Sequence, residues 1–192
     1  MTLMDTEGFE SLYREQSDPW AYHSSAYERE KYRATLEACG PGPFTAALEL
    51  GGSIGVFTGM LAPRCENLVS LDASQTAVTA ARAHLNHCEL ASRVDVRLGA
   101  IPQDIPGGPF DLVLASEVLY YVPDPQLAET LVRLEHGLAP GGRLVAVHWR
   151  PVGPERPHTA AQVHGRLRAC SWLSLTAEHP TADYLLDVFT RR

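Results

Sequence analysis

The stretch Leu48-Glu49-Leu50-Gly51-Gly52-Ser53-Ile54-Gly55 decides the fold class of this chain. It continues a short apolar run, and a second apolar run ends at Asp72, about 20 residues after the first glycine. This is the layout of a strand, a glycine turn, a helix and a second strand in a nucleoside-binding α/β unit. Gly51, Gly52 and Gly55 lack side chains and therefore let the backbone approach a ligand closely. The carboxylate of Asp72 can accept both hydroxyls of a ribose, so the pattern predicts a nucleoside site.

Two details of the glycine turn favour S-adenosylmethionine (SAM) over a dinucleotide. Glu49 precedes the first glycine by two positions, and the strict G-x-G-x-x-G spacing is absent. We expect Glu49 to orient the turn and the amino-acid portion of the ligand, next to the small side chain of Ser53. Ala73, directly after Asp72, and Ser116, at the end of a later strand, complete the predicted cofactor contacts. The alternative is a glycine turn that serves only the close packing of strand and helix.

Length, composition and charge describe an ordinary globular domain. The 192 residues fit one domain, with 45% hydrophobic and 20% charged residues. The net charge of −7 argues against a nucleic-acid partner, because contacts to phosphates need a basic surface. No apolar run approaches the roughly 20 residues of a membrane span, and no basic-then-apolar signal segment opens the chain. Four scattered cysteines without C-x-x-C spacing indicate reduced thiols, so we expect a cytoplasmic protein.

The single predicted domain consists of an N-terminal helical segment, residues 1–43, and an α/β core, residues 44–192. Ser25 and Glu28 have the spacing of a capping box, which predicts a helix that continues to about residue 38. The run Gly40-Pro41-Gly42-Pro43 then breaks the chain before the core begins.

Strands and helices alternate along the core, which predicts a mostly parallel sheet. Strands are predicted at residues 45–50, 67–72, 93–98, 110–115 and 143–149. Helices are predicted at residues 56–61, 74–86, 123–138 and 158–170, with a turn at 139–142. Two last strands, residues 171–176 and 184–190, are joined by a turn at Pro180 that is too short for a crossover, so they should be antiparallel. The predicted fold is α/β: a doubly wound, Rossmann-like, mostly parallel sheet of seven strands with an antiparallel last strand.

Polar side chains gather where the fourth and fifth predicted strands end. Residues 116–121, Ser-Glu-Val-Leu-Tyr-Tyr, follow the fourth strand, and His148 lies at the end of the fifth. Ligands of open α/β sheets bind at this carboxyl edge. We predict that Glu117 and Tyr120 orient or deprotonate the acceptor of a methyl group, and that His148 points into the crevice and assists. The alternative is a helix cap at Glu117 with core tyrosines and a structural histidine.

Two other patterns do not predict a site. His84, His87 and Cys88 have a helical spacing that could serve a metal, but no further ligands are nearby in the sequence, and we expect no metal. Tyr27 and Lys31 have the Y-x-x-x-K spacing of short-chain dehydrogenases. That pair should follow the fourth or fifth strand, whereas here it precedes the glycine turn, which argues against a dehydrogenase.

Six motifs together carry a resemblance to a known family. They are D-P-W at residues 18–20, Y-E-R-E-K at 27–31, L-E-L-G at 48–51, G-V-F-T at 55–58, E-V-L-Y-Y at 117–121 and L-A-P-G-G at 138–142. The glycine motifs mark only the class I SAM-dependent methyltransferases, whereas the other motifs are narrower. With them the chain resembles the nodulation protein S family, rhizobial N-methyltransferases of chito-oligosaccharides.

The resemblance implies that the N-terminal helices form a lid over the cofactor. It implies that Trp20 and Tyr27 wall the SAM pocket, and that Lys31 offers a cation to the SAM carboxylate. Lys31 is the only lysine of the chain, and the alternative is a solvated helix charge.

The chain departs from the family pattern in two places. Superfamily members often place an acid after the third strand to receive the adenine amino group, but here the segment reads Leu98-Gly99-Ala100-Ile101. We therefore expect Ala100 and Ile101 to hold adenine through backbone groups and apolar packing. The resemblance fades beyond Trp149 until the final strand, so the substrate of the family is not carried over.

These observations predict a SAM-dependent methyltransferase that acts on an amine of a small polar molecule, such as an amino sugar. An amine needs only to be neutral when it attacks, whereas a hydroxyl needs a positioned base. The runner-up is a small-molecule O-methyltransferase with His148 as the base. Outside this class, a non-catalytic SAM-binding module and a NAD-dependent oxidoreductase stay open.

Overall fold

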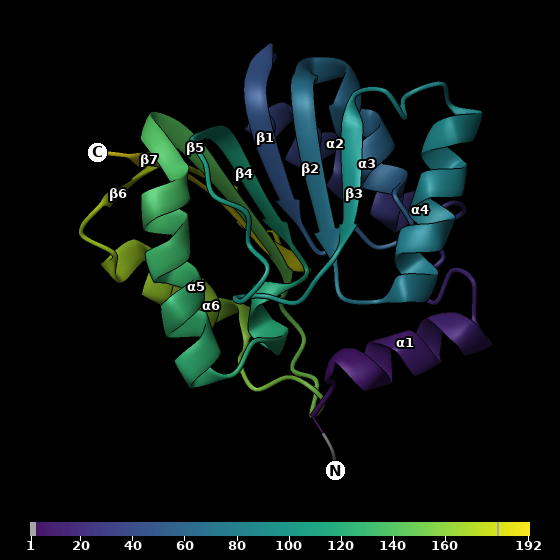
Figure 1. Cartoon of the computed structure of the whole chain (residues 1–192). Helices are drawn as coiled ribbons and strands as arrows, with labels where there is room; N and C mark the ends of the chain where they lie inside the picture. Colours follow the sequence, from purple (N-terminus) through teal and green to yellow (C-terminus); the bar gives the residue numbers. More distant parts are fainter. Residues whose placement is uncertain (1–2, 180) are drawn as a thin grey trace.

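A seven-stranded sheet in the order β3-β2-β1-β4-β5-β7-β6 forms the centre of the protein, in a computed structural model that describes residues 3–179 and 181–192 (Figure 1). The strands are β1 Phe44–Leu50, β2 Cys65–Asp72, β3 Val94–Leu98, β4 Phe110–Ser116, β5 Leu138–Trp149, β6 Leu173–Glu178 and β7 Tyr184–Arg191. The helices are α1 Thr6–Glu15, α2 Ala26–Cys39, α3 Val56–Leu61, α4 Gln75–His87, α5 Asp124–Gly137 and α6 Ala160–Ala169. Short 3-10 turns follow at Ala62–Arg64 and Leu119–Tyr121.

The direction of the strands confirms the predicted fold class. β1 to β5 pair only in parallel with one another, and β7 runs antiparallel to both β5 and β6. The turn expected at Pro180 lies outside the described residues. Because β1 lies between β2 and β4, the strand order reverses at β1, and such a reversal opens a crevice at the carboxyl edge of a sheet.

Successive residues of the central strands supply the two faces of the sheet with apolar side chains. On β4, Leu112 and Leu114 pack with residues of α2 and α3, whereas Val113 and Ala115 pack with residues of α5 and α6. This alternation follows from the two-residue period of a strand and explains why the fourth strand is almost wholly apolar. Figure 1 shows α5 and α2 on opposite sides of the sheet, and α1 lying across the carboxyl ends of the strands.

Side-chain caps fix the first turns of α2 and α4. The Ser25 hydroxyl accepts the N–H of Glu28 at 3.2 Å, as its spacing predicts, but the Glu28 carboxylate turns to Lys31 and does not close the capping box. Ser74 likewise caps α4 by accepting the N–H of Ala77. The expected helical segment of residues 1–43 contains two helices, separated by a loop at residues 16–25.

The largest error of the element prediction is the turn at residues 139–142. In the structure this segment belongs to β5, which begins at Leu138 and pairs with Phe110 before the register shifts to Arg143 opposite Leu112. Gly141 has φ +76°, so the Pro-Gly-Gly segment forms an irregularity inside a long strand. Local turn residues predicted a break, but pairing with β4 continues across it.

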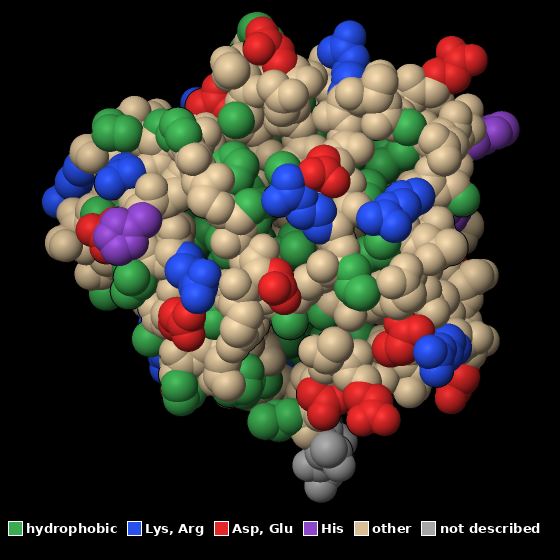
Figure 2. All heavy atoms as spheres, in the orientation of Figure 1, with side chains coloured by type: hydrophobic (Ala, Val, Ile, Leu, Met, Phe, Trp, Pro, Cys, Tyr) green, Lys and Arg blue, Asp and Glu red, His purple; other side chains and the backbone are tan. Residues whose placement is uncertain are grey.

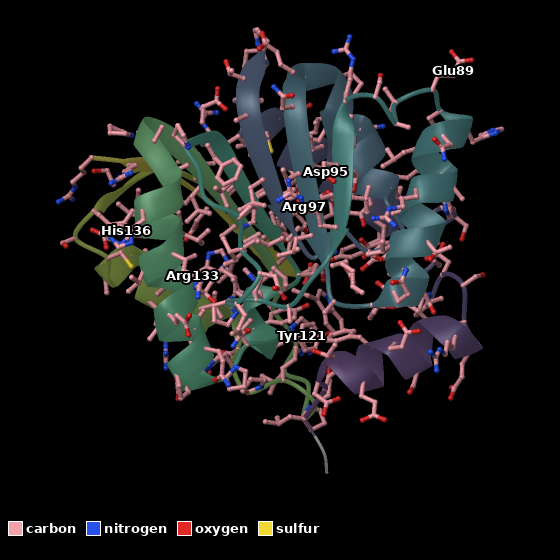
Figure 3. All side chains as sticks on the ribbon, in the orientation of Figure 1. Glu89, Asp95, Arg97, Tyr121, Arg133 and His136 are labelled. Atoms are coloured by element: carbon pink, nitrogen blue, oxygen red, sulfur yellow. The ribbon has the colours of Figure 1, made fainter. Side chains whose placement is uncertain are left out.

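Asp95 and Arg97, two positions apart on β3 and therefore on one face of the strand, are ion-paired at 2.6 Å (Figure 3). On the face of the molecule drawn in Figure 2, acidic and basic side chains are interspersed. Within the described part of the chain, no helix combines the length and the apolar character that crossing a bilayer requires.

Candidate active site

A cavity of about 1120 Å³ lies at the carboxyl edge of the sheet, between the strand ends and the two N-terminal helices. Twelve of the sixteen predicted site residues line it: Trp20, Tyr27, Lys31, Gly51, Ser53, Asp72, Ala73, Ala100, Ile101, Ser116, Glu117 and Tyr120. The other four, Glu49, Gly52, Gly55 and His148, do not. The topology thus brings together segments that are up to 100 positions apart in the sequence.

The glycine turn folds tightly against β2, which explains why two of its glycines are not in the cavity wall. A Cβ on Gly52 would lie 1.9 Å from the Ser70 hydroxyl, and one on Gly55 would lie 3.0 Å from Ala81 of α4. Gly51 lines the cavity at φ +73°, in a region that favours glycine. Gly52 and Gly55 therefore serve close packing, which is the alternative raised for the turn, and of the three glycines only Gly51 lines the cavity.

Asp72 is fixed at the end of β2 by the backbone on both sides. One carboxylate oxygen accepts the N–H of Ser53 at 2.8 Å and the other accepts the N–H of Ser74 at 2.9 Å. Burial raises the pKa of Asp72, and these backbone hydrogen bonds act in the opposite direction. Each oxygen retains a lone pair, so two vicinal hydroxyls of a ribose fit here.

Glu49 lies beneath the turn and not against the cavity. Its Oε2 accepts hydrogen bonds from Thr58 at 2.5 Å and Ser70 at 2.8 Å, which join β1, α3 and β2. The side chain lines only a small adjoining pocket of about 20 Å³, together with Gly52. We therefore correct the expected ligand contact of Glu49: the residue holds the turn, because its acceptor oxygen is engaged inside the fold.

Aromatic residues of the N-terminal segment close the cofactor end of the cavity. Sequence reasoning found Trp20 but missed Tyr13 and Tyr22, which also line the wall. The Tyr13 hydroxyl bonds the Ser53 hydroxyl at 2.5 Å, so α1 touches the glycine turn directly. Four residues before Tyr13, the Phe9 ring packs on Tyr121, which is labelled in Figure 3, with 4.9 Å between ring centroids. The four-residue spacing of Phe9 and Tyr13 is the sequence signal that indicates one apolar helix face.

Lys31 is not a free cation for a cofactor carboxylate. Its Nζ lies 2.8 Å from Glu117 and 3.0 Å from Glu28, and the side chain is buried. Burial alone lowers the pKa of Lys31, but the charges and hydrogen bonds of Glu117 and Glu28 raise it above its ordinary value. We call Glu28, Lys31 and Glu117 the carboxylate–lysine cluster. The predicted role of Lys31 is corrected, because two carboxylates already neutralise it.

Glu117 is held by three donors in an unusual backbone conformation. Lys31 donates to Oε1, while the Tyr120 hydroxyl and the Trp149 N–H, at 2.9 Å, donate to Oε2. Its φ of +55° is in the left-handed region, which costs a non-glycine residue roughly 1 kcal/mol. The three hydrogen bonds retain the side chain in the cavity wall despite this strain.

His148 is fully buried, and the prediction that it points into the crevice is wrong. Its Nε2 accepts the N–H of Leu119 at 3.2 Å, and its Nδ1 lies 3.1 Å from Nε2 of His164. Nδ1 of His164 lies 2.8 Å from Asp187, which Arg168 also contacts. Since Nε2 of His148 accepts, its proton is on Nδ1, which donates to Nε2 of His164, and Nδ1 of His164 in turn donates to Asp187. We call His148, His164 and Asp187 the histidine chain. Burial lowers the pKa of His148 well below 6.5, so it is neutral.

Part of the acceptor end of the cavity is built from residues that sequence reasoning did not identify. Arg156 is buried over the ring of Tyr120, with 4.6 Å from its guanidinium carbon to the centroid, and over the ring of Trp149 at 5.4 Å. Glu155 and Asp183 also line this end. Residues 150–159 carry no motif, so no sequence signal identifies Glu155 and Arg156.

No group of three or more potential metal ligands lies together in the described residues, and at the end of α4 the Cys88 Sγ lies 3.9 Å from Nε2 of His84. The cavity instead fits the parts of SAM. Asp72 can take the ribose, Ala100 and Ile101 offer an apolar wall, and Gly51 allows close approach. The carboxylate–lysine cluster then lies beside the part of the cavity that remains for the acceptor.

Known proteins resemble this chain in sequence and in fold. The family model "Nodulation protein S (NodS)" matches residues 8–150. Nodulation protein S of Sinorhizobium fredii is 33% identical over 147 residues, which cover 74% of this chain and 67% of that protein. Nodulation protein S of Rhizobium tropici is also 33% identical over 147 residues, but the match spans only 60% of its length.

Solved structures extend the similarity to nearly the whole chain. The crystal structure of N-methyltransferase NodS from Bradyrhizobium japonicum WM9 in complex with S-adenosyl-L-homocysteine (SAH) is 28% identical with a TM-score of 0.83, and the match covers 95% of this chain and 97% of that one. A putative methyltransferase from Pseudomonas syringae is 32% identical with a TM-score of 0.74, covering 87% and 100%. The chain therefore belongs to the nodulation protein S family, and it is a SAM-dependent methyltransferase.

Proposed function

We propose that the protein transfers a methyl group from SAM to an amine of a small polar molecule, with an amino sugar as the acceptor class. The observation that carries this proposal is the charge at the acceptor end of the cavity. Four carboxylates line it, Glu28, Glu117, Glu155 and Asp183, against two cations, Lys31 and Arg156. An acceptor that arrives as an ammonium complements this excess of negative charge. The solved relative NodS from Bradyrhizobium japonicum WM9 is an N-methyltransferase, which supports the same acceptor atom.

SAM supplies a methyl group on a sulfonium, and the new C–N bond forms as the C–S bond breaks with its electron pair leaving on sulfur. The protein has to bind both partners, align them and exclude water. We assign Asp72 and Gly51 to the cofactor, with Ser53, Ala73, Ala100, Ile101 and Ser116 around them. Tyr13 and Trp20 close the site from the N-terminal segment. Tyr120 is assigned to the orientation of Glu117, to which its hydroxyl donates.

O-methylation of a small molecule is the weaker alternative. It depended on His148 as a base, and this side chain is buried and engaged on both ring nitrogens. A binding module without activity does not account for the open acceptor end next to the cofactor end.

We further propose that the acceptor is a small molecule and not a nucleic acid, in line with the net charge of −7. The cysteines Cys39, Cys65, Cys88 and Cys170 are free thiols, which supports a reducing compartment such as the cytoplasm.

Acceptor profiling tests the proposal. The protein is incubated with SAM and either a glucosamine dimer or its fully N-acetylated counterpart, and SAH is quantified. We expect SAH to form only with the free amine, and NMR of the product to show an N-methyl group. Equal turnover of the N-acetylated dimer would indicate O-methylation, and SAH binding without turnover of any amine or alcohol would indicate a binding module.

A further inference from the structure

Unpaired polar atoms concentrate around the cavity. Five buried side-chain atoms in residues 3–179 and 181–192 lack a hydrogen-bond partner. Four of them belong to residues that line the cavity: Tyr27 Oη, Glu28 Oε2, Gln126 Oε1 and Arg156 Nε, of which Arg156 Nε is ion-paired with Glu155 at 3.1 Å. Buried polar groups are nearly always hydrogen-bonded, so a group of exceptions around one cavity indicates a polar ligand.

Glu28 is the carboxylate of this group, and its position is well defined. It lies in the first turn of α2 with only 8% of its surface exposed. Its Oε1 accepts from Lys31 at 3.1 Å, whereas Oε2, although 3.0 Å from the same nitrogen, receives no hydrogen bond. The hydroxyl of the preceding residue, Tyr27, is likewise buried and unpaired. One donor thus serves two oxygens, and the second oxygen can accept from a ligand.

The two carboxylates of the carboxylate–lysine cluster differ in their capacity to accept a proton. Glu117 already receives three hydrogen bonds, two of them from groups of the loop after β4 and the end of β5. Glu28 receives one, and burial, against the opposing charge of Lys31, raises its pKa. A carboxylate with a raised pKa is the better general base near neutral pH.

We propose that Oε2 of Glu28 binds the ammonium of the acceptor and removes its proton, with the Tyr27 hydroxyl as the second hydrogen-bonding group. This inference rests on the proposed amine acceptor. One N–H bond of the ammonium breaks, its proton goes to Oε2, and its electron pair stays on nitrogen as the lone pair that attack requires. Glu28 returns the proton to solvent after the product leaves. Lys31 stays protonated and keeps Glu117 paired during the transfer.

The groups around Glu28 determine its pH dependence. The groups that affect its charge or respond to it are Lys31 on the same helix, Glu117 after β4, Asp18 in the loop before α2, and the hydroxyls of Tyr22, Tyr27 and Tyr32. Of these, Lys31 is the cation, and it opposes protonation of Glu28 at every pH at which it is charged. The wild-type kcat/KM should therefore rise with pH as Glu28 ionises and fall again when the acceptor amine loses its own proton in solution.

The variant Glu28→Gln tests the assignment, because the amide retains the shape and an acceptor oxygen for Lys31 but cannot take a proton. With the glucosamine dimer as probe, we expect kcat/KM to fall by about 100-fold at neutral pH. The deficit should shrink as the pH passes the pKa of the amine, since the amine then arrives without its proton. The calorimetric affinity for SAH should stay unchanged. Glu30→Gln, an exposed change on the same helix, is the matched control and should behave as wild type.

Tyr27→Phe removes only the unpaired hydroxyl and should raise the KM for the probe about tenfold with little change in SAH affinity. Glu28→Asp keeps the proton acceptor on a shorter arm and should retain more activity than Glu28→Gln. If Glu28→Gln does not fold, these two variants decide the question.

Three results would overturn the assignment: a wild-type kcat/KM in Glu28→Gln, a loss that is equal at every pH, or a loss that follows weaker SAH binding. If the wild-type protein methylates no amine, the proposed function fails and the assignment fails with it. If wild type methylates the amine and Glu28→Gln shows no pH-dependent deficit, only the role of Glu28 is wrong.

Discussion

Asp72 has one accepted backbone hydrogen bond on each carboxylate oxygen, from Ser53 and from Ser74. In Asp72→Asn, the amide nitrogen would face one of these N–H groups, so one donor loses its partner and one ribose hydroxyl loses its acceptor. We expect the Kd for SAH to rise about tenfold to 100-fold, measured by titration calorimetry. Asp95→Asn on the exposed side of β3 should leave the Kd unchanged. An unchanged Kd in Asp72→Asn would remove Asp72 from the cofactor site.

At the scale of single residues, the sequence predicted well which residues line the cavity. It predicted less well which contacts these residues make there. Asp72 and Glu117 were located because strand ends follow from apolar runs and the glycine turn. The pairing of Lys31 with Glu117 joins residues 86 positions apart and has no local signal. For His148, position at a strand end predicted exposure, but the loop that begins at Leu119 covers it and takes its Nε2 as an acceptor.

At the scale of elements, α1 is docked on α4 by one carboxylate. Glu10 accepts from the Thr76 N–H at 3.0 Å, the Ser74 hydroxyl at 2.7 Å and the Thr76 hydroxyl at 2.8 Å. The backbone hydrogen bond from Thr76, followed by the two hydroxyls, lowers the pKa of Glu10 to about 2. This docking is complete above pH 4.5, the ordinary value, and weakens as the pH falls toward 2.

Glu10→Gln should therefore loosen α1 at neutral pH, because the neutral amide replaces a charge-assisted acceptor at the start of α4. We expect weaker SAH binding and faster tryptic cleavage after Arg14, each followed against wild type. Glu7→Gln, an exposed change on the same helix, is the control. If both variants are cleaved at the wild-type rate, Glu10 does not dock the helix.

The histidine chain gives β5, β7 and α6 a common sensitivity to acid. His148 is neutral in the folded protein because burial, and then His164, lower its pKa, whereas in the unfolded chain it takes up a proton near pH 6.5. The unfolded state thus binds more protons, and the free energy of unfolding should fall as the pH drops below 6.5, by about 1.4 kcal/mol per pH unit for one proton. Urea unfolding between pH 5 and 8 measures this slope.

A matched pair of variants isolates the cause of that slope. His148→Gln should lower the stability at pH 8, through the loss of a buried partner, but flatten the slope below pH 6.5. His136→Gln replaces an exposed histidine of α5 and should keep the wild-type slope. A wild-type slope in His148→Gln would assign the acid sensitivity to another group.

A helix or strand could be predicted from the sequence where its own residues favour the same structure as its contacts with distant strands. The helix Val56–Leu61 was predicted with its exact bounds, since the glycine turn fixes its start. The Pro-Gly-Gly segment was predicted as a turn, but β4 pairs with β5 on both sides of it. Such pairing depends on a distant strand and cannot be derived from the residues of the segment.

At the scale of the whole molecule, the order of strands and the place of the cavity follow from the alternation of elements around one glycine turn. The acceptor end does not. It is formed by Tyr27, Trp149, Arg156 and Asp183, which come from three segments without a shared motif. The family model ends at residue 150, so it includes Tyr27 and Trp149 but not Arg156 and Asp183.

Lys31, the only lysine of the molecule, lies in the wall of a cavity that we assign to a methyl donor. An ε-amine there is at risk of becoming a substrate. Glu117 and Glu28 raise its pKa despite its burial, and a protonated nitrogen has no lone pair with which to attack. The enzyme would thus be protected from self-methylation by the same two carboxylates that favour a cationic acceptor.

Removing one of these carboxylates should expose that risk. We expect Glu117→Gln, incubated with SAM alone, to gain one methyl group on Lys31, as intact-mass and peptide mass spectrometry would show, while wild type and Glu30→Gln stay unmodified. An unmodified Lys31 in Glu117→Gln would mean that geometry, and not charge, spares it. In this view the cluster keeps an amine-modifying enzyme from consuming its own active site.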